Sequence, residues 1–170
     1  MGAIGAEFHL VLGRLKSTLG KQLTQGLSVL DCQRAIGMAL TVGVFPIMGF
    51  ATPVNTLAGV VLRLNQPVVL AANFSTAPLK LALIYPFLRL GEWVFGAEPL
   101  SLSLIELTER FAADWLGMLQ EFGWSFLHAT VGWLICVPLL YFSFFCLSKP
   151  IILSAQAAYE AGVKRIKKEA

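Results

Sequence analysis

Hydrophobic residues fill long stretches of the chain, and charged residues gather in short blocks between them. No charged side chain occurs over residues 35–62 or over residues 122–148. The second run has 27 residues, which exceeds the about 20 that a helix needs to cross the hydrocarbon core of a bilayer. Trp124 and Trp133 lie in its first half and Lys149 follows its end, where interfacial anchors belong. We therefore expect one C-terminal transmembrane helix over 122–148.

The run over 35–62 is also long enough for one span, but its centre favours a broken helix. Pro46, Gly49 and Pro53 lie within eight residues of one another. Proline removes a backbone donor and clashes with the preceding turn, so a helix should break near residues 44–53. Each piece is then too short to cross a membrane alone and has the length of a re-entrant segment.

A second interrupted stretch follows over residues 64–91. Pro67 and Pro78 mark its breaks. Paired apolar segments that are interrupted by Pro or Gly are typical of binding sites in secondary transporters. We expect a core of broken or re-entrant helices over 35–91, and the pattern leaves open whether each segment spans or re-enters.

Two further segments have the period of amphipathic helices. Leucines recur every three or four residues over 6–30, with basic and polar residues on another face. This helix either lies in the membrane interface or packs against its own protein. The segment 101–121 begins with a capping box, Ser103 and Glu106, and has acidic residues opposite its apolar face. We expect it to rest on the membrane surface or to cover the core.

Composition decides the class of protein. Of the 170 residues, 56% are hydrophobic and 14% are charged, whereas soluble domains average about 25% charged residues. Mean hydropathy is +0.72. A soluble domain of this size lacks the interior to hide so much apolar surface, so the sequence predicts an all-α integral membrane protein. The net charge of +3, without a stripe of cations, excludes nucleic acid as a partner.

Charge placement divides this single membrane domain, residues 1–170, into blocks. Both ends of the chain are basic and the block 92–121 is acidic, so the positive-inside rule predicts a multi-pass protein with both termini in the cytoplasm. The expected blocks are the amphipathic N-terminal helix at 1–34, the broken-helix core at 35–91, the acidic amphipathic helix at 92–121, the transmembrane helix at 122–148 and the basic tail at 149–170.

Several spaced motifs resemble a known family. They are Phe45-Pro46-x-x-Gly49-x-x-Thr52-Pro53, Arg63-Leu64-Asn65-Gln66-Pro67, Asn73-x-x-Thr76, Tyr85 and Gly91. Over residues of about 30–95 the chain resembles the small bacterial membrane proteins catalogued as domain of unknown function 2062. That family typically has Pro after the second-motif Asn, where Phe74 stands here. The resemblance implies a location in the bacterial inner membrane and no particular activity. The layout is also similar, more loosely, to DedA-type lipid-carrier transporters with paired re-entrant hairpins.

Polar residues beside the breaks are the candidate ligand-binding residues. They are Thr52, Asn55, Arg63, Asn65, Asn73, Thr76 and Lys80. Broken helices present backbone N–H groups and helix N-termini, which favour a phosphate or carboxylate, and Arg63 and Lys80 could supply the cationic partners. The alternative is that Arg63 snorkels to the interface while Asn and Thr satisfy broken backbone.

Three functions are compatible with this pattern. The favoured one is a small transporter or flippase-like protein that binds an anionic lipid or polyprenyl lipid-carrier headgroup between its broken helices. The second is a non-catalytic scaffold or assembly factor, whose amphipathic helices bind partners. The third is a membrane-embedded lipid-modifying enzyme that uses acidic residues such as Glu92 or Glu98. We expect no metal and no cofactor, because no ligand spacing or nucleotide motif is present. Gly37, Gly43 and Gly59 would allow close helix approach in a homo-oligomer.

Overall fold

The computed structural model describes most of the chain. Its described residues are 13–15, 17–22, 26–47, 49–98, 109, 113–114, 116–117 and 122–169, with the side chains of the last range described to residue 162. Within these ranges every regular element is a helix and no strand occurs, which confirms the predicted all-α class. The elements are α2 (Val29–Gly43), α3 (Ala51–Val61), α4 (Gln66–Phe74), α5 (Ala77–Phe95) and α8 (Gly123–Glu169).

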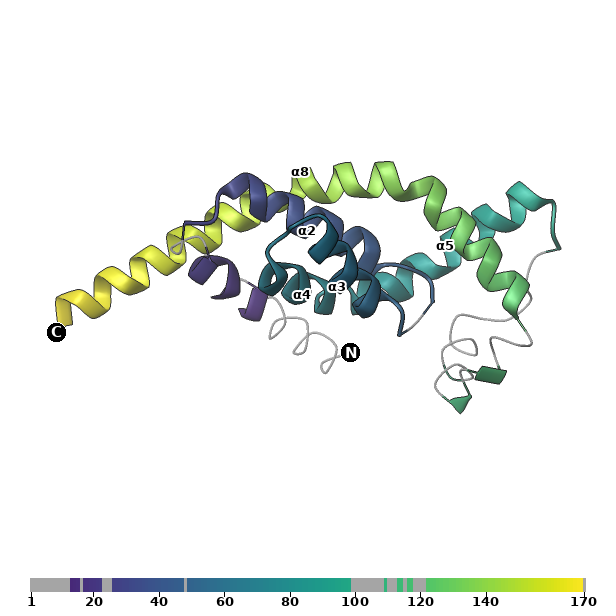
Figure 1. Ribbon diagram of the computed structural model, residues 1–170, viewed down its shortest axis with the longest axis horizontal. Coiled ribbons are helices and arrows are strands. Elements are labelled where there is room, and N and C mark those ends of the chain that lie inside the picture. Colours follow the sequence, from purple (N-terminus) through teal and green to yellow (C-terminus); the bar gives the residue numbers. More distant parts are fainter. Residues whose placement is uncertain are drawn as a thin grey trace.

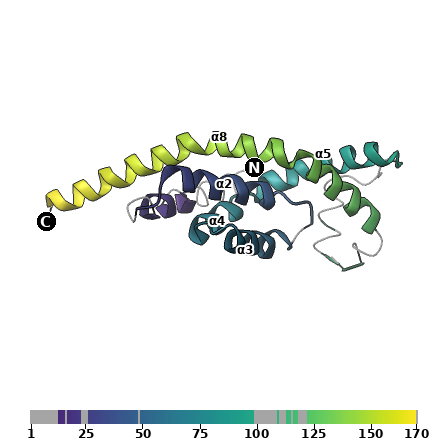
Figure 2. The same cartoon turned by 45° about the horizontal axis from the view of Figure 1, so that its top comes forward.

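Helix α8 is the longest element and arches over the others (Figure 1). Helix α5 packs against its first part and α2 against its middle. Helices α3 and α4 contact α2 on the side turned away from α8, which Figure 2 shows from a second direction. The molecule therefore has three layers, with α2 in the middle layer.

The length and composition of α8 make it a candidate membrane span. Its segment Gly123–Gly162 contains an apolar window with a mean hydropathy of 2.0. Helices α4 and α5 pass the same test together, as a pair bent by 69°. The described part of the chain thus has one helix that is long and apolar enough to cross a membrane, or two if the bent pair counts as one span.

Helix α8 also corrects one predicted boundary. The expected transmembrane helix at 122–148 and basic tail at 149–170 form one continuous helix through both Pro138 and Pro150. The tail is rich in Ala, Lys, Arg and Glu, which are strong helix formers. Nothing in its composition therefore ends the helix where the charge begins.

The chain breaks where the sequence predicts it. Within residues 44–53, α2 ends at Gly43 and α3 begins at Ala51. Beside Pro67 and Pro78, α4 begins at Gln66 and α5 at Ala77. What differs from expectation is that most of these prolines begin a helix and do not end one. Pro46 and Gly49 lie in the connection between α2 and α3, whereas three other prolines lie in the first turns of helices. These are Pro53 in α3, Pro67 in α4 and Pro78 in α5. The first turn has no intrahelical partner for an N–H group, so proline starts a helix there without cost.

The predicted amphipathic helix over 6–30 is not one uninterrupted helix. Its described part is helical at 13–15 and 17–22, and the chain then turns at Gly26, whose φ is 95°. Ser28 starts α2 by accepting a hydrogen bond from the Asp31 N–H at 3.1 Å, so α2 crosses the expected boundary at residue 34. Most of the predicted helix over 101–121 lies outside the described residues.

Two glycines let α5 and α8 cross in backbone contact. A Cβ atom added at Gly91 would lie 1.8 Å from the carbonyl oxygen of His128, and one added at Gly132 would lie 2.0 Å from that of Phe87. Because each glycine faces the backbone of the other helix, this crossing has no room for any side chain.

Helix α3 buries small and polar residues and exposes large apolar ones. Its buried residues are small or polar, namely Ala51, Asn55 and Gly59. Its large apolar residues face outward, and their exposed fractions exceed one half at Leu57, Val60 and Val61. Helix α8 likewise exposes Leu134, Leu139, Phe142 and Leu147.

Candidate functional site

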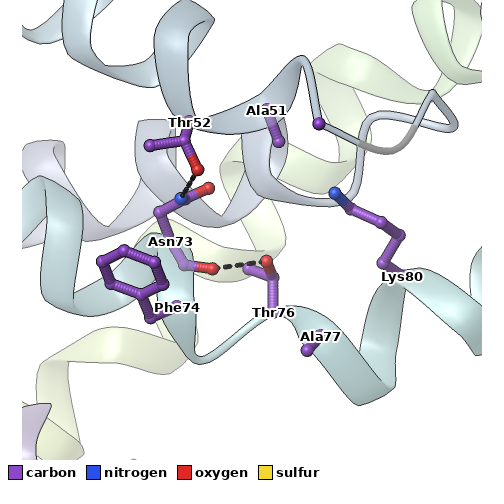
Figure 3. Close-up of a pocket in the computed structure, with 8 residues that line it drawn as sticks. Ala51, Thr52, Asn73, Phe74, Thr76, Ala77 and Lys80 are labelled. Atoms are coloured by element: carbon purple, nitrogen blue, oxygen red, sulfur yellow. Dashed lines mark hydrogen bonds between the residues drawn. The ribbon is translucent and has the colours of Figure 1, made fainter.

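A small cavity lies where α3 and α5 begin (Figure 3). Its volume is about 170 Å³. We call it the polar cavity, and the residues that line it are Gly49, Ala51, Thr52, Asn73, Phe74, Thr76, Ala77 and Lys80. Its walls come from the connection before α3, the first turn of α3, the end of α4 and the first turn of α5.

Two helix N-termini face this cavity. Helix α3 begins at Ala51 and α5 at Ala77, and no side chain caps the first turn of either helix. The first N–H groups of a helix lack intrahelical partners and carry the positive end of the helix dipole. Since Ala51 and Ala77 both line the cavity, the starts of the two helices border the same space.

A network of amide and hydroxyl groups lies beside the polar cavity. The Asn55 Nδ2 atom donates to the carbonyl oxygen of Ala39 at 3.1 Å and to Oδ1 of Asn73 at 2.7 Å. The Asn73 Nδ2 atom donates in turn to Oγ1 of Thr52 at 3.0 Å (Figure 3). Asn55 is fully buried and Asn73 nearly so. The network therefore ties α2, α3 and α4 at one point.

Thr76 connects the bend between α4 and α5 to the end of α2. Its hydroxyl lies 2.6 Å from the carbonyl oxygen of Asn73 and 3.2 Å from that of Gly43. A Cβ atom at Gly43 would lie 2.5 Å from the Thr76 methyl group. Glycine is therefore needed for α2 to reach the bend. We call Thr52, Asn55, Asn73 and Thr76 the polar junction.

Lys80 supplies the positive side chain of the cavity. It stands at the end of the first turn of α5, and Figure 3 shows its ammonium group directed toward the start of α3. Among the described residues Lys80 forms no ion pair. The site therefore has an uncompensated positive charge in addition to the two helix ends.

The structure brings together most of the residues predicted for binding. Thr52, Asn73, Thr76 and Lys80 line the polar cavity, and Asn55 lies directly behind it through its hydrogen bond to Asn73. The residues not singled out in advance are Ala51 and Ala77, which contribute backbone, and Phe74. Two alanines in an apolar sequence carry no signal that would have identified them.

Arg63 and Asn65 lie elsewhere. Helix α3 ends in a Schellman motif, in which the Leu64 N–H donates to the Gly59 carbonyl at 2.8 Å and the Arg63 N–H to the Val60 carbonyl at 3.1 Å. Arg63 is at the C-terminal end of α3, with a φ of 53°. Eleven residues of helix separate the two ends of α3, a distance of about 16 Å. Arg63 therefore does not share the cavity with Lys80.

Asn65 has a helix-capping position instead. Its Oδ1 atom accepts from the Val68 N–H at 3.1 Å and starts α4, while its Nδ2 atom donates to Oε1 of Gln22 at 2.8 Å. These bonds use both polar atoms of the Asn65 side chain and link α4 to the N-terminal helical segment.

One of the two acidic residues considered for catalysis, Glu92, is already paired. Glu92 is buried near the end of α5, and its carboxylate accepts from Arg89 Nη1 at 2.8 Å. Arg89 also bonds the Tyr85 hydroxyl and lies over the Tyr85 ring. Within the described ranges no group of three His, Cys, Asp or Glu side chains is placed to hold a metal ion.

The chain matches the model of a protein family. The model of a family described as "Uncharacterized protein conserved in bacteria (DUF2062)" matches residues 16–159. This range includes residues 17–22 of the N-terminal helical segment and most of α8, well beyond the residues of about 30–95 that carried the resemblance. Neither the curated proteins nor the solved structures that were compared give a match. The chain therefore belongs to the DUF2062 family.

Proposed function

We propose that this member of the DUF2062 family is a multi-pass protein of the bacterial inner membrane that binds an anionic headgroup in its polar cavity. The headgroup belongs to a lipid or a polyprenyl lipid carrier, and the protein acts as a small transporter or flippase. The observation that carries the proposal is the convergence of two uncapped helix N-termini and the Lys80 ammonium group on one cavity.

The membrane assignment is supported by helices that bury polar side chains and expose large apolar ones. The amides of Asn55 and Asn73 are buried, while Leu57 and Val61 of α3 are about two-thirds exposed, at 66% and 68%. In water this arrangement would leave a large apolar surface uncovered. In a bilayer it places hydrocarbon against the lipid and polar groups in the interior, where small and polar residues mediate helix packing.

The long helix supports the same assignment. Only 6% of the most apolar window of α8 is buried inside the molecule, so the environment rather than the protein covers it. The bent pair α4 and α5 has the form of a re-entrant or broken segment. The cations at both ends of the chain favour a cytoplasmic location of both termini.

The anion assignment follows from charge and hydrogen-bonding capacity. Helix N-termini bind phosphate and carboxylate groups through backbone N–H donors and the helix dipole. Lys80 adds a full positive charge, and a charge-assisted hydrogen bond to it is about twice as strong as a neutral one. A cavity of about 170 Å³ has room for a headgroup, while the chains of the lipid stay in the surrounding bilayer.

The proposed transport step uses the bend between α4 and α5. Helix α3 is held to α4 by the hydrogen bonds of Asn55 and Asn73, and its outer face has no protein contact among the described residues that would cover Leu57 or Val61. The headgroup enters between the starts of α3 and α5, where backbone N–H groups and Lys80 replace its lost hydration. A movement of α3 relative to α5 would then open the cavity to the other side.

The test compares the lipids that the purified full-length chain retains in mild detergent. Wild type is compared with Lys80→Gln and with the matched control Arg63→Gln, which removes the same charge outside the cavity. Lipid mass spectrometry should find one anionic lipid class enriched in wild type and in Arg63→Gln. In Lys80→Gln the enrichment should fall by about tenfold or more, because a hydrogen bond to a charged group contributes about 1.5–3 kcal/mol.

The class of lipid identifies the source of the headgroup, since a phospholipid and a polyprenyl phosphate differ in mass. A vesicle assay with that lipid in fluorescent form then measures transbilayer movement, which Lys80→Gln should abolish. Identical bulk lipid in all three proteins would overturn the proposal and favour the scaffold function. Enrichment without transbilayer movement would restrict the function to lipid binding.

A further inference from the structure

A second cavity lies on the other side of α5. Its volume is about 500 Å³, within the range of about 300–1,000 Å³ that small-molecule sites occupy. Helix α2, the first turns of α5 and the middle of α8 form most of its walls, and Leu15 and Ser75 complete the lining. The residues that characterise it are Ile36, Leu40, Leu79, Ala82, Phe144 and Ile151. We call it the apolar cavity.

The lining of the apolar cavity offers nothing to a polar ligand. Ser75 and Ser148 are the two hydroxyl side chains among its described lining residues. Each is satisfied within its own segment, since Ser75 donates to the Ala71 carbonyl at 3.0 Å and Ser148 to the Phe145 carbonyl at 2.8 Å. Water requires two to four polar partners to occupy a cavity, and apolar cavities bind apolar molecules. The lining of this cavity therefore suits a hydrocarbon ligand.

The cavity extends from the molecular surface into the core. Leu147 at its mouth is 65% exposed, while Ile36 at its wall is 2% exposed. If α8 lies in the bilayer, its outer face is surrounded by acyl chains, so the mouth opens onto them. We infer that the apolar cavity holds one acyl chain of a membrane phospholipid. This inference rests on the proposed membrane location and not on the proposed anion binding.

The two cavities are separate sites. Helical periodicity of 3.6 residues per turn places Ala77 and Lys80 on one face of α5, and Leu79 and Ala82 on the opposite face. The first pair lines the polar cavity and the second pair lines the apolar cavity. An acyl chain in the apolar cavity supports the start of α5 from behind, while the headgroup site remains open in front.

The experiment uses the full-length chain in phosphatidylcholine vesicles that contain a phosphatidylcholine with a photoreactive group in its acyl chain. Because this lipid has no net charge, its binding does not depend on the polar cavity. After illumination and digestion, mass spectrometry should find the label concentrated on residues 79–82 and 144–151. Ala82→Trp fills the cavity and should lower that labelling by about tenfold, a ratio that corresponds to ~1.4 kcal/mol.

Two variants serve as controls. Leu139→Trp adds a large side chain at a 70% exposed position of α8 outside the cavity lining and should leave labelling unchanged. Ala82→Leu fills less space and should lower labelling to an intermediate degree, which keeps the test valid if Ala82→Trp fails to fold. Circular dichroism of each variant establishes that the helices are present.

Uniform labelling of the exposed residues of α3 and α8, with no response to Ala82→Trp, would overturn the inference. Displacement of the label by an added polyprenyl chain, and not by excess phosphatidylcholine, would also overturn it and assign the cavity to an isoprenoid. Lys80→Gln should leave the labelling intact. If the labelling persists in a protein that shows no enrichment of anionic lipid, the acyl-chain site is supported and the proposed headgroup site is not.

Discussion

The molecule holds its helices together in two different ways at the two ends of α5. Near its C-terminal end, α5 crosses α8 at Gly91 and Gly132, where backbone touches backbone. At its N-terminal end, α5 borders the polar junction, in which Thr76 bonds to the end of α2 and Asn73 of α4 bonds to α3 through directional hydrogen bonds. The first contact excludes all space, whereas the second keeps two helix starts apart and leaves the polar cavity between them.

The two contacts have different roles, because the crossing makes the molecule rigid and the junction leaves room for a ligand. Dispersion contacts stabilise only atoms that touch, so a crossing built on them cannot also contain a binding site. Hydrogen bonds between side chains act over the length of those side chains, so the junction can be stable and hollow at once. We therefore expect substitutions at the crossing to damage stability most, and substitutions at the cavity to change binding most.

The largest effect is expected at the crossing. Gly91→Ala and Gly132→Ala each place a Cβ atom within 2.0 Å of a carbonyl oxygen, so α5 and α8 must move apart. Overpacking against backbone should lower the free energy of unfolding by about 3 kcal/mol or more. Unfolding of the purified protein, followed by circular dichroism, measures this loss.

The matched control is Gly162→Ala, which is also in α8 and has no atom within 4 Å of the added Cβ. It should stabilise the protein slightly, because alanine is the better helix former. Equal unfolding free energies for Gly132→Ala and Gly162→Ala would mean that the backbone contact at the crossing is not what holds α5 to α8.

A smaller loss of stability is expected at the polar junction. Asn73→Ala removes the acceptor for Asn55 and the donor for Thr52, which leaves the buried Asn55 amide with fewer partners. The free energy of unfolding should fall by about 1–3 kcal/mol. In a double-mutant cycle, Asn55→Ala and Asn73→Ala should show a coupling energy of about 0.6–1.7 kcal/mol, which are the average and the maximum for side-chain hydrogen bonds between helices in a bilayer.

Thr56→Ala is the control for the junction. Its hydroxyl is exposed and donates to the Thr52 carbonyl within the same helix, so its loss should change stability by less than about 0.5 kcal/mol. Additive effects of Asn55→Ala and Asn73→Ala would contradict the view that these amides act as one unit.

The sequence predicts the helical class and the break before α3 because both depend on local composition. Pro46 and Gly49 act on the backbone around them, and no distant residue changes that effect. The role of Pro53 could not be predicted in the same way, since proline both ends helices and begins them. Only the position of the preceding helix end decides between the two.

The candidate site shows a similar limit. Arg63 and Lys80 look equivalent in the sequence, as single cations in apolar stretches. The fold distinguishes them by placing one at the C-terminal end of α3 and the other at the beginning of α5. Helix ends have opposite partial charges, so the two cations have opposite electrostatic effects that linear spacing does not reveal.

That contrast gives the smallest and most specific predicted effect. A positive charge near a helix N-terminus is unfavourable, and near a C-terminus it is favourable, by about 0.3–1 kcal/mol in each case. Lys80→Met should therefore raise the free energy of unfolding by about this amount, while Arg63→Met should lower it. Unfolding of both variants in the same uncharged detergent measures the sign of each change in the free energy of unfolding.

Added anionic lipid distinguishes a binding residue from a merely unfavourable one. A ligand that binds only the folded state raises stability with its concentration, so phosphatidylglycerol should stabilise wild type and Arg63→Met but not Lys80→Met. If Lys80→Met destabilised the protein without lipid, Lys80 would have a structural partner and the cavity would lose its uncompensated charge. A gain in stability together with a loss of lipid response would instead mean that the protein keeps this charge, against its own stability, for the anion that the charge binds.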